Sequence, residues 1–113
     1  MTALIRDAEA FHRLAASGAE LLVVYFADWC PHCVRFLREC GPTLDALAGP
    51  AVIRRDVSDE DTDACWEDEC SVKVVPTIAL WRGGRIVARL DGVLGQGIEP
   101  ARLARWFAGL DAP

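Results

Sequence analysis

The hydrophobic and polar positions along the chain predict an α/β domain. Residues 21–27, LLVVYFA, form an uninterrupted apolar run with the length and β-branched content of a buried parallel strand. Residues 51–57, AVIRRDV, read as a second strand, and the segment between the two carries apolar residues at helical steps of three and four. A strand, a helix and a second strand in this order indicate a βαβ unit.

Further helices are expected near both ends of the sequence. Asp7 is a suitable N-cap for a first helix, whose apolar residues share one face and which stops before Gly18. A last helix begins at Pro100, and its apolar positions recur with the period of an amphipathic helix. These positions are Leu103, Trp106, Phe107 and Leu110.

The rest of the pattern predicts a β-hairpin and an interrupted central helix. Residues 77–81 and 85–90 read as antiparallel strands joined at Gly83 and Gly84. In the helix after residue 30, Gly41 and Pro42 break the pattern, and because proline lacks an N–H the helix is expected to kink or split there. Its buried stripe is expected to comprise Val34, Leu37, Gly41, Leu44 and Leu47.

Length and charge narrow the possible functions. The 113 residues predict one domain, 1–113, and the formal net charge of −5 argues against nucleic acid or an anionic membrane as the main partner. No secretory leader or membrane span is recognisable, so a cytoplasmic location is expected. Residues 59–69 contain seven acidic residues and no basic one, which predicts a helix with an acidic face for recognising basic protein surfaces.

The strongest chemical signal is the stretch Trp29-Cys30-Pro31-His32-Cys33 directly after the first apolar strand. Pro31 suits the first position of a helix, which places Cys30 at the N-cap. Unpaired backbone N–H groups and the helix dipole favour a thiolate there, and a protonated His32 would add positive charge. This pattern predicts a redox-active dithiol in which Cys30 is the nucleophile and Cys33 the resolving thiol.

This motif resembles that of the thioredoxin family, and Val75-Pro76-Thr77 lies where that family has its cis-proline. The resemblance implies a thioredoxin-like fold with a mixed central sheet and helices on both faces. It also implies a thiol–disulfide oxidoreductase that acts on disulfide-containing proteins and receives electrons from a thioredoxin-reductase-type donor, without a bound cofactor. Val75 and Pro76 would bind the substrate. Trp29, which would flank the sulfurs as an apolar contact surface, would tune the thiols together with Pro31 and His32.

Two departures from the family pattern affect the expected chemistry. The family carries a buried Asp six residues before the first cysteine, where this sequence has Val24. Water, Asp28 or Asp59 would then have to take the proton of Cys33. Histidine beside Cys30 and the loss of the buried acid both favour the reduced form, which predicts a reduction potential above the roughly −270 mV of thioredoxin.

The remaining cysteines and two other functions provide alternatives to this interpretation. A zinc site from Cys30, Cys33, Cys65 and Cys70 is disfavoured, because a second Cys-x-x-Cys is missing from the sequence. Cys40 is expected in the core, Cys70 resembles a regulatory cysteine of animal thioredoxins, and none of Cys40, Cys65 and Cys70 is expected to be catalytic. A glutathione-linked glutaredoxin-type enzyme and a non-enzymatic partner-binding module on the same fold remain alternatives.

Overall fold

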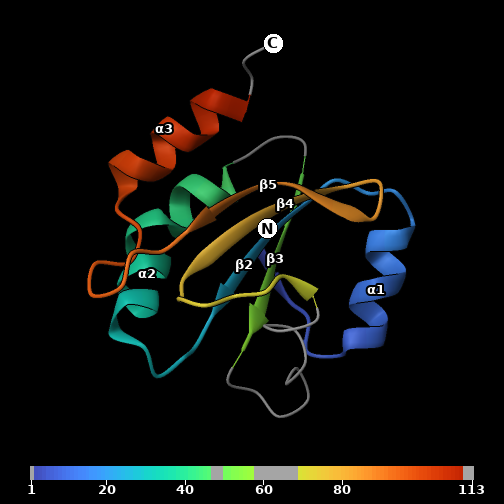
Figure 1. Ribbon diagram of the computed structural model, residues 1–113, viewed down its shortest axis with the longest axis horizontal. Helices are drawn as coiled ribbons and strands as arrows, with labels where there is room; N and C mark the ends of the chain where they lie inside the picture. Colours follow the sequence, from blue (N-terminus) through green and yellow to red (C-terminus); the bar gives the residue numbers. More distant parts are fainter. Residues whose placement is uncertain (1, 47–49, 58–68, 111–113) are drawn as a thin grey trace.

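The computed structural model describes residues 2–46, 50–57 and 69–110, which form a central sheet between helices (Figure 1). Met1, residues 47–49, residues 58–68 and residues 111–113 lie outside this description. In chain order the elements are β1 (Thr2–Leu4), α1 (Ala8–Ala16), β2 (Leu21–Phe26), α2 (Pro31–Asp45), β3 (Ala51–Asp56), β4 (Thr77–Arg82), β5 (Arg85–Asp91) and α3 (Pro100–Leu110).

The sheet is mixed and has the strand order β1-β3-β2-β4-β5. Strands β1, β3 and β2 are parallel to one another, whereas β4 is antiparallel to both β2 and β5. The carboxyl ends of β2, β3 and β5 and the start of β4 therefore meet at one edge of the sheet. At this edge Phe26 pairs with Asp56 on β3, and Tyr25 pairs with Thr77 on β4.

The helices cover both faces of the sheet, as the resemblance implies (Figure 1). Phe11 and Ala15 of α1 pack in one buried cluster with alternate residues of β2, among them Val23 and Tyr25. On the other face, α2 and α3 pack in a second cluster against the intervening residues of β2. Because all six residues of β2 are buried, this strand is the shared centre of both clusters, which explains its unbroken apolar run.

Local sequence signals set the helix ends largely as predicted. The Asp7 side chain caps α1 by accepting a hydrogen bond from the backbone N–H of Glu9 at 3.1 Å, and Gly18 follows the helix with a positive φ of 85°. Helix α2 is not split at Pro42. Only its last residues follow the proline, and the helix ends at Asp45, so the missing N–H affects only the final turn.

Three expectations about individual segments require correction. The short strand β1 was not predicted, because three residues carry no periodic signal and its pairing with β3 is what defines it. Val34 is not in the buried stripe of α2, since half of its surface is exposed. Leu47 and most of the acidic segment 59–69 lie outside the described residues, but the described Glu69 is buried instead of exposed.

Glu69 is buried because it pairs with Arg55 in the cluster on the α1 face. Its carboxylate accepts hydrogen bonds from Arg55 Nη2 at 2.7 Å, Arg55 Nε at 3.2 Å and the Tyr25 hydroxyl at 2.7 Å. Arg55 also donates to the carbonyl oxygen of Ile5 at 2.9 Å and stacks over the ring of Phe11. This network connects the residue after β1, helix α1 and strands β2 and β3 to the last residue of the acidic segment.

Candidate active site

Cys30 lies at the N-cap of α2, directly after β2. Its backbone is extended, Pro31 follows in the first turn, and the Cys30 carbonyl accepts the first helical hydrogen bonds from Cys33 and Val34 at 3.0 Å. The Cys30 side chain makes no capping hydrogen bond, so its sulfur stays available for chemistry. Eight per cent of the residue is exposed. Both the N-cap position of Cys30 and the place of Pro31 agree with the prediction from sequence.

Cys33 lies one turn further along α2 and has no exposed surface. Its sulfur accepts a hydrogen bond from the backbone N–H of Ala27 at 3.5 Å. Burial raises the pKa of the Cys33 thiol to about 12, an effect that this hydrogen bond partly offsets and that Cys30 and the charge of Asp56 reinforce. The two cysteines therefore differ in accessibility although they share one apolar cluster.

The Val75–Pro76 peptide bond is cis, and Val75 packs against the cluster that contains both cysteines. The fold thus brings together two motifs that lie more than 40 residues apart in the sequence. The end of β5 approaches the proline closely, because a Cβ atom on Gly92 would lie 2.5 Å from the Pro76 carbonyl oxygen. Sequence reasoning read Gly92 only as the end of the hairpin, yet this contact requires glycine.

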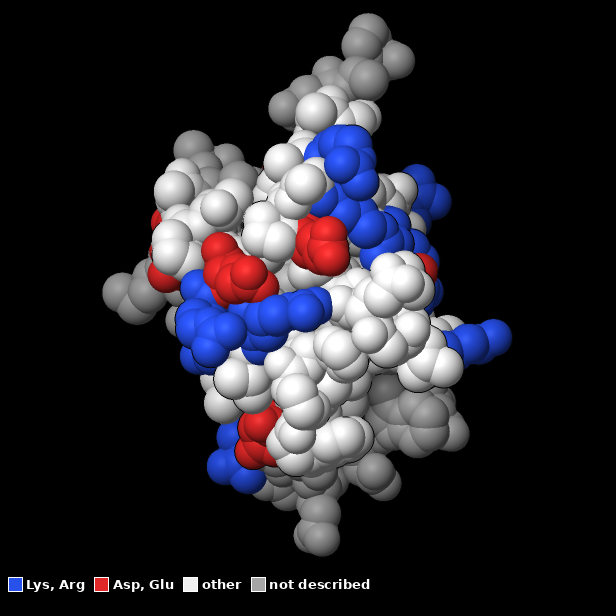
Figure 2. Space-filling view, turned by 90° about the vertical axis from the view of Figure 1, so that its left-hand side faces the viewer, with Lys and Arg blue, Asp and Glu red and all other residues white. Residues whose placement is uncertain are grey.

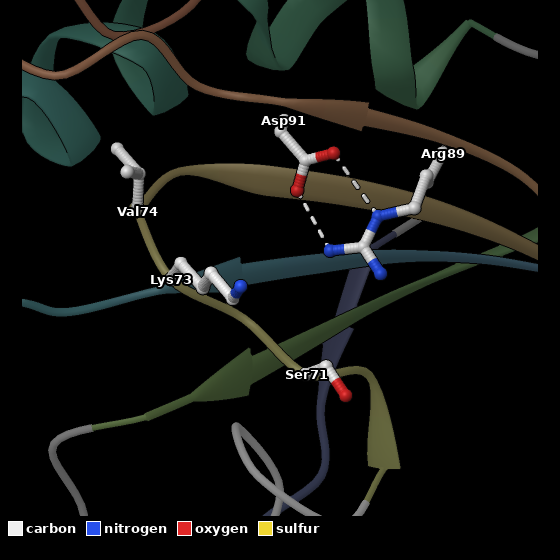
Figure 3. A pocket seen from close by; sticks show the side chains of 5 residues that line it. All are labelled: Ser71, Lys73, Val74, Arg89 and Asp91. Atoms are coloured by element: carbon white, nitrogen blue, oxygen red, sulfur yellow. Dashed lines mark hydrogen bonds and ion pairs between the residues drawn. The ribbon is translucent and has the colours of Figure 1, made fainter.

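Side chains of β4 and β5 fix the segment that leads to the cis-proline. Arg89 donates to the carbonyl oxygen of Cys70 at 2.7 Å, and the Thr77 hydroxyl donates to the carbonyl oxygen of Val74 at 2.6 Å. Arg89 also forms a two-point ion pair with Asp91, as Figure 3 shows. A hollow of about 430 Å³ beside this segment is lined by Ser71, Lys73, Val74, Arg89 and Asp91.

The surroundings of the thiols combine exposed apolar side chains with a loop that contacts α2. Trp29 and Leu94 are 71% and 85% exposed, and His32 is half-buried and therefore less exposed than either. The loop from 93 to 97 lies on the first turn of α2, since a Cβ on Gly97 would come within 3.1 Å of the His32 Cβ. The side of the molecule with α2 and α3 shows a band of Lys and Arg beside an area without charged side chains (Figure 2).

Comparison with known proteins identifies the family. The sequence profile described as Thioredoxin matches residues 2–101. The chain belongs to the thioredoxin family. Together with its paired cysteines, this membership makes it a thiol–disulfide oxidoreductase of the thioredoxin type.

Individual members of the thioredoxin family match over most of the chain. Mouse thioredoxin is 32% identical over 102 residues, which cover 88% of this chain and 93% of that protein. A bifunctional thioredoxin reductase/thioredoxin of Mycobacterium leprae is 30% identical over 98 residues, but these cover 85% of this chain and only 20% of that protein. The crystal structure of thioredoxin f2 from Chlamydomonas reinhardtii superposes with a TM-score of 0.79 at 16% identity, covering 100% and 99% of the two chains. These comparisons establish a thioredoxin-like fold.

The other cysteines and acids occupy separate places in this thioredoxin-like domain. Cys40 is buried in the α2 cluster, as expected, and Cys70 in the α1 cluster on the opposite face from Cys33. A zinc site that includes Cys70 therefore disagrees with the fold, and the described residues contain no group of three or more His, Cys, Asp or Glu that could hold a metal. Cys65 and Asp59 lie outside the described residues, and Asp28 is exposed.

No helix in the described part of the chain is long and apolar enough to span a membrane.

Proposed function

We propose that Cys30 is the nucleophile and Cys33 the resolving thiol of a dithiol that reduces disulfide bonds in proteins. The observation that carries this assignment is the difference between the two sulfurs. Cys30 keeps an exposed fraction at the start of α2, whereas Cys33 is fully buried and has a raised pKa. A substrate disulfide can therefore reach Cys30 first, and Cys33 acts only on what Cys30 has bound.

The reaction has two exchange steps. The Cys30 thiolate attacks one sulfur of the substrate disulfide, and the other substrate sulfur leaves as a thiolate. Cys33 then attacks the Cys30 sulfur, which releases the second substrate sulfur and leaves a Cys30–Cys33 disulfide. Two electrons have passed to the substrate, so no bound cofactor is needed.

Substrate binding would involve the surface around Cys30. An extended substrate segment would pair with the main chain of Val75 before Pro76, in the manner of an added β-strand. Trp29, directly before Cys30, offers an exposed apolar surface. Pro31 and His32 would tune the dithiol, because they are the two residues between its sulfurs.

The oxidised dithiol must be returned to its reduced form. A relative from Mycobacterium leprae is named as a thioredoxin reductase and a thioredoxin in one protein, which supports a reductase of that class as the electron donor. A dithiol that such a reductase keeps reduced suits a reducing compartment such as the cytoplasm.

The test is reduction of insulin disulfides with NADPH and a thioredoxin reductase. The Cys30→Ser and Cys33→Ser variants should both lose turnover, and only Cys33→Ser should accumulate a mixed disulfide with the substrate. A mixed disulfide that accumulates on Cys30→Ser instead would reverse the two roles. Turnover that proceeds faster with glutathione and glutathione reductase than with thioredoxin reductase would favour the glutaredoxin-type alternative, and binding without turnover the non-enzymatic one.

A further inference from the structure

The resolving step requires Cys33 to lose its proton inside an apolar cluster. Because burial raises the pKa of the Cys33 thiol to about 12, almost all of this thiol is protonated at pH 7. A group that accepts the proton as the sulfur attacks would therefore accelerate the step. Val24, where the resemblance leads one to expect an acid, is fully buried and cannot titrate.

Asp56 places a carboxylic acid on the neighbouring strand at the same end of the sheet. Its Cα pairs with that of Phe26, and the N–H of the next residue, Val57, donates to the Phe26 carbonyl oxygen at 2.7 Å. Phe26 in turn belongs to the apolar cluster of Cys30 and Cys33. The half-buried Asp56 thus flanks the cluster that contains both sulfurs.

The alternation of side chains along β3 gives the direction of Asp56. Val52 packs with α2, and Asp56, four residues later, falls on the same face of the strand. Arg55 points the opposite way, toward Phe11 of α1. Asp56 therefore lies on the face covered by the helix that carries Cys33, and its negative charge acts on that thiol.

Among the described residues, the other charged and titratable groups at this end of the sheet leave Asp56 as the suitable acceptor. They are Asp28, Cys30, His32, Arg35, Arg54 and Asp91. Asp28 is exposed, and Asp91 is engaged with Arg89 beside the cis-proline segment. Arg54 lies on the same face of β3 as Asp56, two residues earlier in the strand.

We propose that Asp56 accepts the proton of Cys33 when the mixed disulfide is resolved. As this proton passes to the Asp56 carboxylate, Cys33 Sγ bonds to Cys30 Sγ and the bond between Cys30 and the substrate sulfur breaks. The electron pair of that bond stays on the substrate sulfur, which takes a proton from solvent, and Asp56 returns its proton to solvent. In this protein the proton acceptor is thus on β3, whereas the family pattern has an acid at the position of Val24 on β2.

This proposal rests on the proposed function, and one experiment separates the two. Reduced protein is mixed rapidly with dithiobis(nitrobenzoate), an aromatic disulfide that releases a coloured thiolate in each step. The first phase, attack by Cys30, depends on reagent concentration, whereas the second phase, attack by Cys33, does not. A Cys33→Ser variant identifies the second phase because it lacks it.

The Asp56→Asn variant should keep the first phase and slow the second by roughly 100-fold or more at pH 7, because a positioned base typically contributes about 10²- to 10⁴-fold. Between pH 6 and 9 its second-phase rate should rise about tenfold per pH unit, because only hydroxide then removes the proton, and the wild-type rate should rise less steeply. If Asp56 only repelled the Cys33 thiolate and took no part in proton transfer, Asp56→Asn would have the opposite effect on the rate of the second phase. Removing the negative charge would lower the pKa of Cys33 and make the second phase faster.

Two further variants control the result. Asp45→Asn, at the exposed far end of α2, should leave both phases unchanged. Val24→Asp, added to Asp56→Asn, should restore the second phase to within about tenfold of wild type, because Val24 pairs with Arg54 on β3. Arg54 Nε is buried and, among the described residues, has no hydrogen-bond partner, so it can receive a carboxylate at position 24.

Each outcome decides the matter. The proposal would be overturned if Asp56→Asn left the rate of the second phase unchanged, raised it, or lowered it equally at every pH. It would also be overturned if Asp28→Asn slowed the second phase and Asp56→Asn did not. Loss of the first phase in the wild type would instead refute the proposed function. If Val24→Asp unfolds the protein, the pH dependence of Asp56→Asn still gives the answer.

Discussion

Removing one partner of the buried pair Arg55 and Glu69 should destabilise the domain strongly. The Glu69→Gln variant keeps the size of the side chain but removes its negative charge. Arg55 would remain charged and fully buried, with only the Ile5 carbonyl and the Phe11 ring as its other partners in the described part of the chain. A glutamine at this position also cannot accept all three hydrogen bonds that Glu69 receives, because half of its terminal group is a donor.

Removal of one member of a buried ion pair typically costs about 3–5 kcal/mol of unfolding free energy. Such a domain is stable by about 5–15 kcal/mol in total, so the variant would lose a large share. At about 4 °C per kcal/mol for a chain of this size, the midpoint of thermal unfolding should fall by roughly 12–20 °C. Tyr25 adds to the cost, since its hydroxyl bonds the same carboxylate.

The assay is urea denaturation of the reduced protein, followed by circular dichroism and tryptophan fluorescence as two independent probes. The matched control is Glu20→Gln, which removes an ion pair with Arg82 whose side chains are 35% and 54% exposed, and it should cost at most about 1 kcal/mol. The triple variant Tyr25→Phe, Arg55→Met and Glu69→Met should recover most of the loss, because it leaves no buried charge. If Glu69→Gln costs no more than Glu20→Gln, the network is not a buried ion pair in solution.

Three other predictions concern the thiols. Limiting iodoacetamide at neutral pH should alkylate Cys30 before Cys33, because Cys30 keeps a small exposed fraction whereas Cys33 has none, and burial raises the pKa of Cys33. Peptide mass spectrometry that finds Cys33 labelled first would reverse the assignment. The reduced protein should lose stability as pH rises above about 9, since Cys33 and Cys70, with pKa values of about 12 and about 11, keep their protons when folded and lose them when unfolded. Each thiol should lower the free energy of unfolding by about 1.4 kcal/mol per pH unit until the pH reaches the pKa of that thiol in the folded protein. Urea unfolding curves that coincide at pH 8 and pH 10 would contradict this. Equilibration with glutathione should give a reduction potential between roughly −270 and −120 mV, and His32→Pro should lower it; an unchanged value would exclude tuning by His32.

The elements that could be read from the sequence are those whose cause is local. An unbroken apolar run predicts β2, and Cys30 followed by Pro31 predicts the start of α2, because each depends on neighbouring residues alone. The pair of Arg55 and Glu69 escaped prediction, since Glu69 ends a segment whose composition indicates an exposed acidic face. Its carboxylate meets Arg55 only in the folded chain, where Tyr25 of β2 and Arg55 of β3 both donate to it.

The same limit applies to the active site. Its two motifs could be placed because each has a recognisable pattern, but the contact of Gly92 with Pro76 depends on how β5 ends against β4. From the sequence, water, Asp28 and Asp59 are the candidate proton acceptors, and Asp56 is not among them. The register between β2 and β3 places Asp56 beside Phe26, next to the cluster that contains both cysteines. The sequence pattern does not determine this register to the residue.

The continuity of α2 links the redox chemistry to the folding equilibrium. Cys33 belongs to the same helix as Phe36, Cys40 and Leu44, whose buried side chains hold α2 in the core. Oxidation and unfolding form a thermodynamic cycle, so any substitution that stabilises one redox form more than the other must shift the potential by the equivalent amount, about 30 mV for 1.4 kcal/mol. Residues deep in the core, far from any substrate, can therefore set how strongly reducing this protein is, and evolution can adjust the potential without changing a residue of the motif.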